Sequence, residues 1–178
     1  MKSIFDDFEI IEPDKLKDYY KPGVWAMFGV PMELEEDRYV CLNVGKNICI
    51  GEELQIDYKR LESFNLFQPK KYVNQFNQMM FSYPRFADRQ DYLYKEISER
   101  YRNIVTILVT DDANNAYVVE KYFAYTTEAK YWVSNGRYKS STKVDIEQIR
   151  KNIDISMINP ELIKKIISFG KKYRNQKL

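Results

Sequence analysis

The sequence contains no histidine and only two cysteines, Cys41 and Cys49. The absence of histidine excludes imidazole-ligated metal sites, and it excludes catalysis that needs an imidazole base or a Ser-His or Cys-His pair. The two cysteines do not have the spacing of a zinc site, and no base is evident near Cys41, which is therefore expected to be a small buried residue. A hydrolase built from this chain has to use a carboxylate, a tyrosine, a lysine or metal-bound water.

The chain also lacks a long apolar run. No stretch approaches the roughly 20 residues that a membrane helix needs, so no membrane association is expected. The first residues, Met-Lys-Ser-Ile-Phe-Asp-Asp-Phe-Glu, are acidic and do not have the basic start and apolar stretch of a signal peptide. We therefore expect a cytoplasmic protein.

What is present describes an ordinary globular chain. Its 178 residues are 44% hydrophobic and 30% charged, which favours one domain over residues 1–178 with a sizeable core. The 15 tyrosines and 10 phenylalanines are many, but such enrichment reflects packing more often than base stacking.

The net charge of +2 is unevenly distributed along the chain. Residues 1–62 hold 8 basic and 14 acidic residues, residues 63–129 hold 8 of each, and residues 130–178 hold 12 basic and 4 acidic residues. The basic C-terminal third fits either a surface that faces phosphates or a solvated helix face.

Three stretches have the pattern of strands. In residues 38–47, Val40, Leu42 and Val44 alternate with Tyr39, Cys41 and Asn43, which predicts a half-buried strand whose second set faces a cleft or solvent. Residues 23–30 form a short apolar strand that should pair with it. Residues 103–110 are mostly apolar and β-branched, which is typical of a strand inside a sheet. Residues 1–12 fit an edge strand or a packed arm.

Several other stretches have apolar residues at helical spacing. We expect helices over residues 13–20, 52–64, 72–81, 87–102, 113–129, 144–152 and 160–172. Consecutive strands without an intervening helix favour antiparallel pairing. The predicted fold class is α+β: a small three-stranded antiparallel sheet flanked by helices, with a helical insertion at about 66–102 and a basic helical C-terminal extension over 139–178.

Several short motifs occur in a specific order: Gly23-Val-Trp25, then Leu42-Asn-Val-Gly-Lys46, then Glu120 and Asn135. Together they resemble a diverged GIY-YIG nuclease-like domain over about residues 22–138. The resemblance implies a β-β-α-β-α core. It also implies a Glu that holds a divalent metal, an Arg that steadies the phosphate, tyrosines that position or activate water, and a later Asn.

The chain departs from that pattern at the residues that would carry out catalysis. Trp25 and Asn43 stand where the two motif tyrosines belong, Glu53 stands where the arginine belongs, and Asp57 replaces a frequent histidine. A tryptophan can donate a hydrogen bond but cannot accept a proton. Candidate stand-ins are Lys46 after the turn, Tyr39 on the predicted face of Asn43, and Arg60 two helical turns beyond Glu53.

The resemblance therefore implies a candidate site and two readings of it. Its catalytic candidates are Asn43, Lys46, Arg60 and Asn135, its metal ligand is Glu120 for Mg²⁺ or Mn²⁺ if the site is active, and its nucleic-acid contacts are Lys46, Arg137 and Lys139. One reading is a metal-dependent endonuclease of substituted type. The other is a domain that keeps the fold, has no cofactor and no catalytic activity, and binds nucleic acid or a protein partner. A third hypothesis, in which the resemblance is accidental, is a structural or interaction module, with the helix 160–172 as the place for a partner or a homodimer contact.

Overall fold

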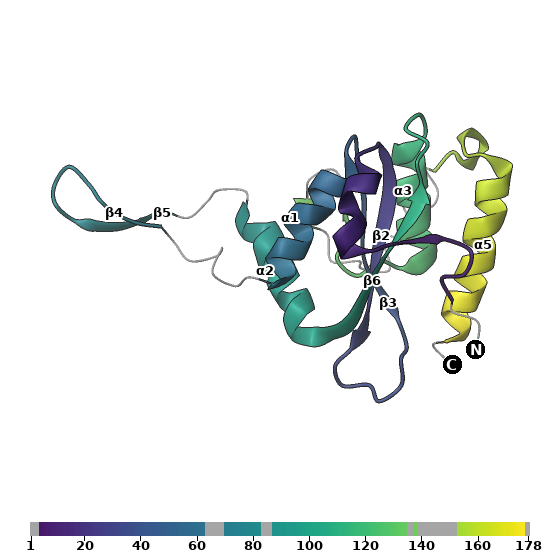
Figure 1. The fold of residues 1–178 in the computed structure, drawn as a ribbon, viewed down its shortest axis with the longest axis horizontal. Coiled ribbons are helices and arrows are strands. Elements are labelled where there is room, and N and C mark those ends of the chain that lie inside the picture. Colours follow the sequence, from purple (N-terminus) through teal and green to yellow (C-terminus); the bar gives the residue numbers. More distant parts are fainter. Residues whose placement is uncertain (1–3, 63–69, 83–86, 135–136, 139–152, 177–178) are drawn as a thin grey trace.

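The computed structural model describes residues 4–62, 70–82, 87–134, 137–138 and 153–176 (Figure 1). Its centre is an antiparallel sheet with the strand order β1-β6-β2-β3. The four strands are β1 (Glu9–Ile11), β2 (Gly23–Pro31), β3 (Val40–Asn47) and β6 (Tyr101–Thr110). The α+β class is therefore confirmed.

The predicted sheet was one strand too small. Residues Glu9–Ile11 pair with Leu108, Ile107 and Thr106 of β6, so the N-terminal segment is an edge strand and β6 is an interior strand. Of the two alternatives for residues 1–12, the edge strand is the one that the structure contains, but a three-residue strand has too little periodicity to be assigned to a sheet without its partner.

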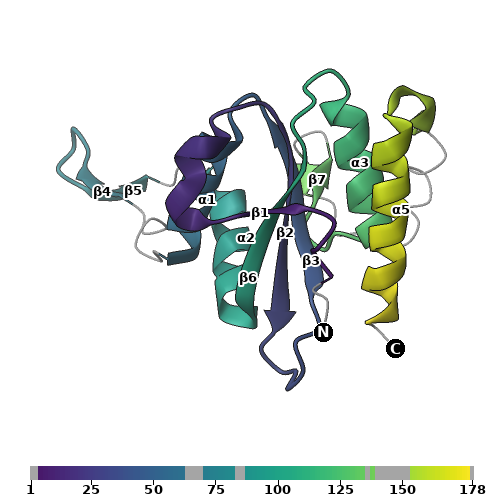
Figure 2. The same ribbon diagram turned by 45° about the vertical axis from the view of Figure 1, so that its right-hand side comes forward.

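Helices cover both faces of the sheet (Figure 2). The 3-10 helix η1 and helices α1 and α2 lie on one face, and α3 and α5 lie on the other. These elements are η1 (Pro13–Tyr19), α1 (Ile50–Glu62), α2 (Ala87–Arg100), α3 (Ala116–Thr127) and α5 (Pro160–Asn175). Short elements complete the described part: η3 (Ile155–Met157) and the paired strands β7 (Val133–Ser134) and β8 (Arg137–Tyr138).

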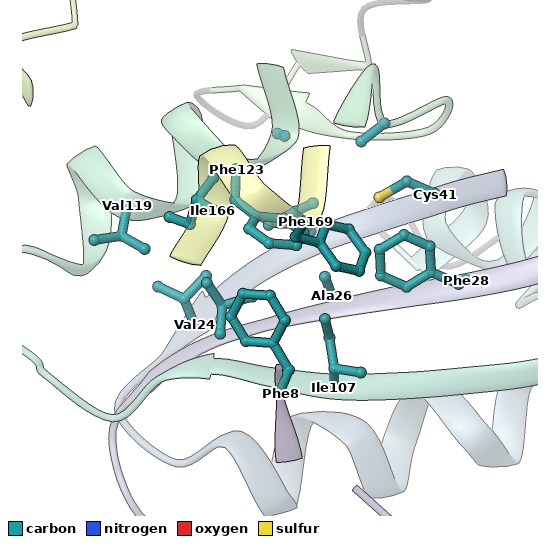
Figure 3. Close-up of a cluster of buried hydrophobic side chains, with 14 of the residues drawn as sticks. Phe8, Val24, Ala26, Phe28, Cys41, Ile107, Val119, Phe123, Ile166 and Phe169 are labelled. Carbon is teal, nitrogen blue, oxygen red and sulfur yellow. The ribbon is translucent and has the colours of Figure 1, made fainter. Parts of the chain in front are cut away.

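The sheet separates two clusters of buried side chains because successive residues of a strand point to opposite faces. Val24, Ala26 and Phe28 of β2 pack with Phe123 of α3 and Phe169 of α5 (Figure 3). The alternate residues of β2 pack against α1 and α2. Every residue of β2 is buried, as expected for an interior strand covered on both sides.

The predicted faces of β3 were wrong after Leu42, because Val44 does not share the face of Val40 and Leu42. Met27 pairs with Asn43 but Phe28 pairs with Cys41, so Leu42 is an extra residue, a bulge, in β3. Cys41 therefore packs with Val44 on the α3 side and is fully buried, rather than sharing a face with Asn43. A bulge reverses the alternation, and a sequence pattern of period two cannot reveal it.

The expected helix over residues 72–81 was also wrong. The chain instead forms a hairpin of β4 (Lys70–Val73) and β5 (Met79–Ser82), in which Val73 pairs with Met79. Asn77, in a left-handed conformation with φ of 61°, reverses the chain. The helical insertion thus consists of a hairpin and α2, while the expected helix over 144–152 lies outside the described residues.

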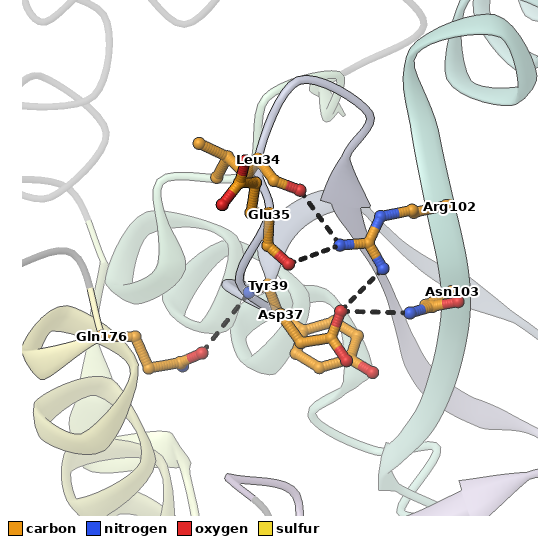
Figure 4. A network of polar contacts seen from close by, with 7 residues as sticks. All are labelled: Leu34, Glu35, Asp37, Tyr39, Arg102, Asn103 and Gln176. Carbon is orange, nitrogen blue, oxygen red and sulfur yellow. Dashed lines mark hydrogen bonds and ion pairs between the residues drawn. The ribbon is translucent and has the colours of Figure 1, made fainter.

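The acidic loop between β2 and β3 is hydrogen-bonded to the start of β6 (Figure 4). Arg102 donates to Asp37 Oδ1 at 2.7 Å and to the carbonyl oxygens of Leu34 and Glu35, and Asn103 also donates to Asp37. In the part of the chain that the structure describes, no helix has the length and apolarity needed to cross a membrane.

Candidate functional site at the edge of β3

A cavity of about 110 Å³ lies at the edge of strand β3. Side chains from both faces of the sheet meet there, because β3 is the last strand of the sheet and both helical layers reach past it. The first residues of β3 are covered at this edge, since the backbone N–H groups of Lys130 and Tyr131 donate to the carbonyls of Cys41 and Leu42. The cavity follows directly, lined by Trp25, Asn43, Val44, Gly45, Lys46, Glu53, Asp57, Leu93, Tyr94 and Glu120.

Glu120 enters the cavity from α3 and is only 7% exposed. Its Oε2 lies 3.0 Å from Lys46 Nζ, and its Oε1 accepts a hydrogen bond of 3.2 Å from Trp132 Nε1. Burial raises the pKa of the Glu120 carboxyl, and the Lys46 ammonium and the Trp132 indole oppose this rise. Both oxygens of this carboxylate therefore already have a donor from the protein.

Glu53 enters from the other side, on the first turns of α1. Trp25 Nε1 donates to Glu53 Oε2 at 2.8 Å, and the Asn47 side chain also hydrogen-bonds to this carboxyl. Burial, helped by the neighbouring carboxylates of Asp57 and Glu120, raises the pKa of Glu53 to about 7, and the hydrogen bonds from Trp25 and Asn47 oppose this rise. Glu53 is thus half protonated near neutral pH, which places a proton donor or acceptor in the cavity.

Asp57, one turn further along α1, is buried and forms an ion pair of 2.8 Å with Arg60. Burial raises the pKa of Asp57, while hydrogen bonding from the Tyr94 hydroxyl and the charge of Arg60 lower it. The hydroxyl of Tyr94 also accepts from Asn43 Nδ2 at 3.4 Å. Asn43, Tyr94, Asp57 and Arg60 therefore form one polar chain from β3 through α2 to α1.

Of the residues predicted from the sequence, the cavity brings together Asn43, Lys46 and Glu120. Arg60 lies one contact away, behind Asp57, and its guanidinium is 5.8 Å from the centre of the Tyr94 ring. Asn135 and Lys139 lie outside the described residues. Arg137 lies in β8, but its side chain is not among those that the structure describes.

Tyr39 does not take part in the site. Its ring packs on Phe5 at 4.9 Å, and its backbone N–H donates to the Gln176 side chain. Tyr39 thus packs against the N-terminal segment and does not stand in for a motif tyrosine.

The sequence reasoning missed Tyr94 and treated Glu53 and Asp57 as losses rather than as members of the site. A signal for the two carboxylates exists, because positions four apart on a helix share one face. No comparable signal exists for Tyr94, whose place depends on how α2 packs against α1 after a long excursion of the chain.

Gly45, within the Val-Gly-Lys motif, has a packing role. A Cβ atom at this position would lie 2.5 Å from Cζ2 of Trp25, so only glycine lets the indole lie flat against β3. This close approach aims Trp25 Nε1 at Glu53.

The residues present do not fit a divalent metal ion held by Glu120. A Mg²⁺ or Mn²⁺ ion needs carboxylate oxygens with free lone pairs, whereas the oxygens of Glu120 are engaged by Lys46 and Trp132. Across the described ranges, no group of three or more Asp, Glu or Cys residues is close enough to hold a metal. The ammonium of Lys46 lies beside Glu120, where the resemblance expects the cation.

Comparisons of the chain with family models, with curated proteins and with solved structures gave no significant match.

Proposed function

We propose that this chain is a GIY-YIG-like domain that binds nucleic acid without hydrolysing it. The order of β2, β3, α1, β6 and α3 supports the resemblance, because it is the strand and helix order that the resemblance implies. The observation that carries the proposal is the Lys46–Glu120 ion pair, in which the protein's own ammonium neutralises the expected metal ligand.

The other replacements in the cavity argue against phosphodiester hydrolysis. Hydrolysis needs positive charge where negative charge develops, and loss of one such contact costs about 10²–10³ in rate. Here Glu53 stands at the expected arginine position and accepts from Trp25, which stands at a tyrosine position. The cavity thus has the Glu53 carboxyl where the resemblance expects a positive charge, and its cations Lys46 and Arg60 are already paired with Glu120 and Asp57.

Binding can use other surfaces. The sequence of residues 130–178 holds 12 basic and 4 acidic residues. Within this part, α5 exposes Lys164, Lys165, Lys171, Lys172 and Arg174. Lysines and arginines that contact phosphates release counterions, which gives affinity without sequence preference.

Two assays on the full chain test this proposal. Fluorescence anisotropy with labelled DNA and RNA should show binding that weakens by a factor of ten or more between about 50 and 200 mM salt. Incubation with plasmid, single-stranded DNA and RNA in the presence of Mg²⁺ or Mn²⁺ should leave every substrate intact. Cleavage that disappears in Glu120→Ala would contradict the non-hydrolytic reading and support the nuclease.

The alternative is a non-catalytic module that binds a protein partner. Large exposed apolar side chains outside the β4–β5 hairpin favour it, including Ile48 at 87% exposure. Absence of binding to DNA and RNA at low salt, or an affinity that does not respond to salt, would reject nucleic-acid binding in favour of this alternative.

A further inference from the structure

The hairpin β4–β5 stands apart from the sheet and its helices (Figures 1 and 2). Its strands have four residues each, and their register runs from Lys70 opposite Ser82 to Val73 opposite Met79. A two-stranded hairpin alone in water is marginally stable at best. We therefore expect the projecting hairpin to be stabilised by contact with a binding partner.

The turn at the tip of the hairpin is stabilised by side-chain hydrogen bonds. Asn74 Oδ1 accepts hydrogen bonds from the backbone N–H groups of Phe76 at 2.9 Å and Gln78 at 3.0 Å, and Asn74 Nδ2 donates to the Gln78 side chain. The backbone N–H of Asn77 donates to the Asn74 carbonyl at 3.0 Å. These bonds fix the turn from one asparagine, and they hold Phe76 outwards at 71% exposure.

Apolar side chains continue from the tip along the strands. Val73 is 56% exposed, Met79 is 60% exposed and Met80 is 39% exposed. Val73 and Met79 are direct partners across the hairpin, so they share one face, and Met80 lies on the opposite face. Exposed apolar side chains gathered on one projecting element are typical of an interaction surface.

The charge of this part of the sequence indicates the class of partner. Residues 63–87 contain Lys70, Lys71 and Arg85 but no aspartate or glutamate, although acidic residues are frequent before and after this range. The same 25-residue range is rich in asparagine and glutamine, whose amides recognise base edges. A basic, amide-rich and acid-free segment fits a polyanion that also offers apolar and hydrogen-bonding edges.

We propose that the β4–β5 hairpin inserts into the major groove of double-stranded DNA. This inference rests on the proposed function, nucleic-acid binding, and names the element that performs it. The major groove, about 12 Å wide and 8.5 Å deep, admits a two-stranded β-ribbon. Four residues of strand span about 13 Å, so the tip can reach the floor of the groove. Phe76 and Met79 then contact thymine methyl groups and base edges, while the side chains of Gln75 and Asn77, which flank Phe76, supply hydrogen bonds.

The test compares full-length variants by anisotropy on one duplex DNA. Phe76→Ala should weaken binding by roughly tenfold, because the apolar surface that the ring buries against thymine methyl groups and base edges is lost. Met79→Ala should weaken it by a smaller factor. Met32→Ala is the matched control, since Met32 is 51% exposed in the loop after β2, and it should leave the affinity unchanged. Circular dichroism of each variant verifies that the fold is intact.

A second comparison varies the nucleic acid. Duplex RNA of the same sequence should bind at least tenfold more weakly and should not respond to Phe76→Ala, since the major groove of A-form RNA is deep and narrow. Duplex DNA binding that is unchanged in both hairpin variants would overturn the hairpin's role while leaving the proposed function intact. Absence of all nucleic-acid binding would overturn both.

The remaining outcomes would show that the hairpin contacts a partner other than duplex DNA. Binding to anionic lipid vesicles, or a dimer in sedimentation experiments, that is lost in Phe76→Ala while DNA binding is retained would overturn the inference in favour of a membrane surface or a second copy of this chain. Tighter binding to single-stranded than to duplex DNA would also overturn groove insertion.

Discussion

Trp25 and Glu53 are joined by a hydrogen bond of 2.8 Å from the indole Nε1 to the carboxylate Oε2. These are two of the positions at which the chain departs from the GIY-YIG-like pattern, a tyrosine position and the arginine position. The structure shows that they interact as a pair. The donor-only indole stabilises the carboxylate, and the pair links β2 to α1 across the cavity.

Trp25→Phe tests this pair. We expect the free energy of unfolding to fall by about 2–4 kcal/mol at pH 8, because a hydrogen bond to a charged group and part of a buried ring are lost. Urea denaturation measures the change. The control is the double variant with Glu53→Gln, which should show a coupling energy of about 1 kcal/mol or more. Strictly additive effects would mean that the pair has no energetic role.

Glu53→Gln tests the raised pKa. The folded pKa of about 7 lies above the ordinary value of 4.5, so the folded state binds the proton more tightly. This contribution to stability is complete below pH 4.5, is lost as the pH rises to about 7, and amounts to about 3 kcal/mol. Denaturation at a series of pH values should show this decline in the natural protein and a smaller one in the variant.

The matched control for that measurement is Glu52→Gln, because Glu52 is the neighbouring residue on α1 and is exposed. It should leave the pH dependence of stability unchanged. A decline of equal size in the natural protein and in Glu53→Gln would contradict the assignment to Glu53, and would shift it to Asp57 and Glu120, whose pKa values burial also raises.

Much of the sheet could be predicted because most of its strands have a clear pattern in their own sequence. Residues 103–110 are β-branched and apolar, and the alternation around Val44 gives an amphipathic strand beside residues 23–30. Helical spacing also predicted the helix that carries Glu120, whereas the place of Glu120 in a site came from the resemblance. In each case the signal lies within one element, where side-chain periodicity reports burial directly.

The rest depended on contacts between elements. The bulge at Leu42, which turns Cys41 towards α3, is a matter of pairing with β2. The hairpin at residues 70–82 depends on the turn chemistry of Asn74 and Asn77, which competes with an apolar spacing that suits a helix. Tyr94 joins the site only because α2 packs on α1, and no local pattern reports such packing.

Lys46→Ala tests the ion pair with Glu120. Removal of the ammonium leaves the Glu120 carboxylate, whose side chain is 10% exposed, with the hydrogen bond from the Trp132 indole. We therefore expect the free energy of unfolding to fall by about 1–3 kcal/mol at neutral pH. The matched control is Lys164→Ala, which removes a pair with Glu161 in which both side chains are more than 70% exposed. That pair should contribute less than about 1 kcal/mol. Equal losses in thermal unfolding would contradict a special role for the buried pair.

Gly45→Ala tests the packing of the indole. The new methyl group would approach Trp25 Cζ2 to 2.5 Å, so the ring has to shift, and we expect a loss of about 1–3 kcal/mol with a change in tryptophan fluorescence. The double variant with Trp25→Phe relieves the crowding and should lose less than the sum of the two single changes. An unchanged stability for Gly45→Ala would show that the glycine serves another purpose, such as approach to a phosphate.

Addition of Mn²⁺ tests the place of the Lys46 ammonium. A ligand at 100 times its dissociation constant stabilises the folded state by about 2.7 kcal/mol, so metal binding would be evident in a thermal melt. We expect no shift for the natural protein, because Lys46 and Trp132 engage both oxygens of Glu120. Lys46→Ala frees Oε2 beside the carboxyl of Glu53 and should gain a Mn²⁺-dependent rise, which Lys46→Ala combined with Glu120→Gln should lack. A rise already present in the natural protein and lost in Glu120→Gln would instead identify Glu120 as a metal ligand, and the ammonium as a group that the metal displaces.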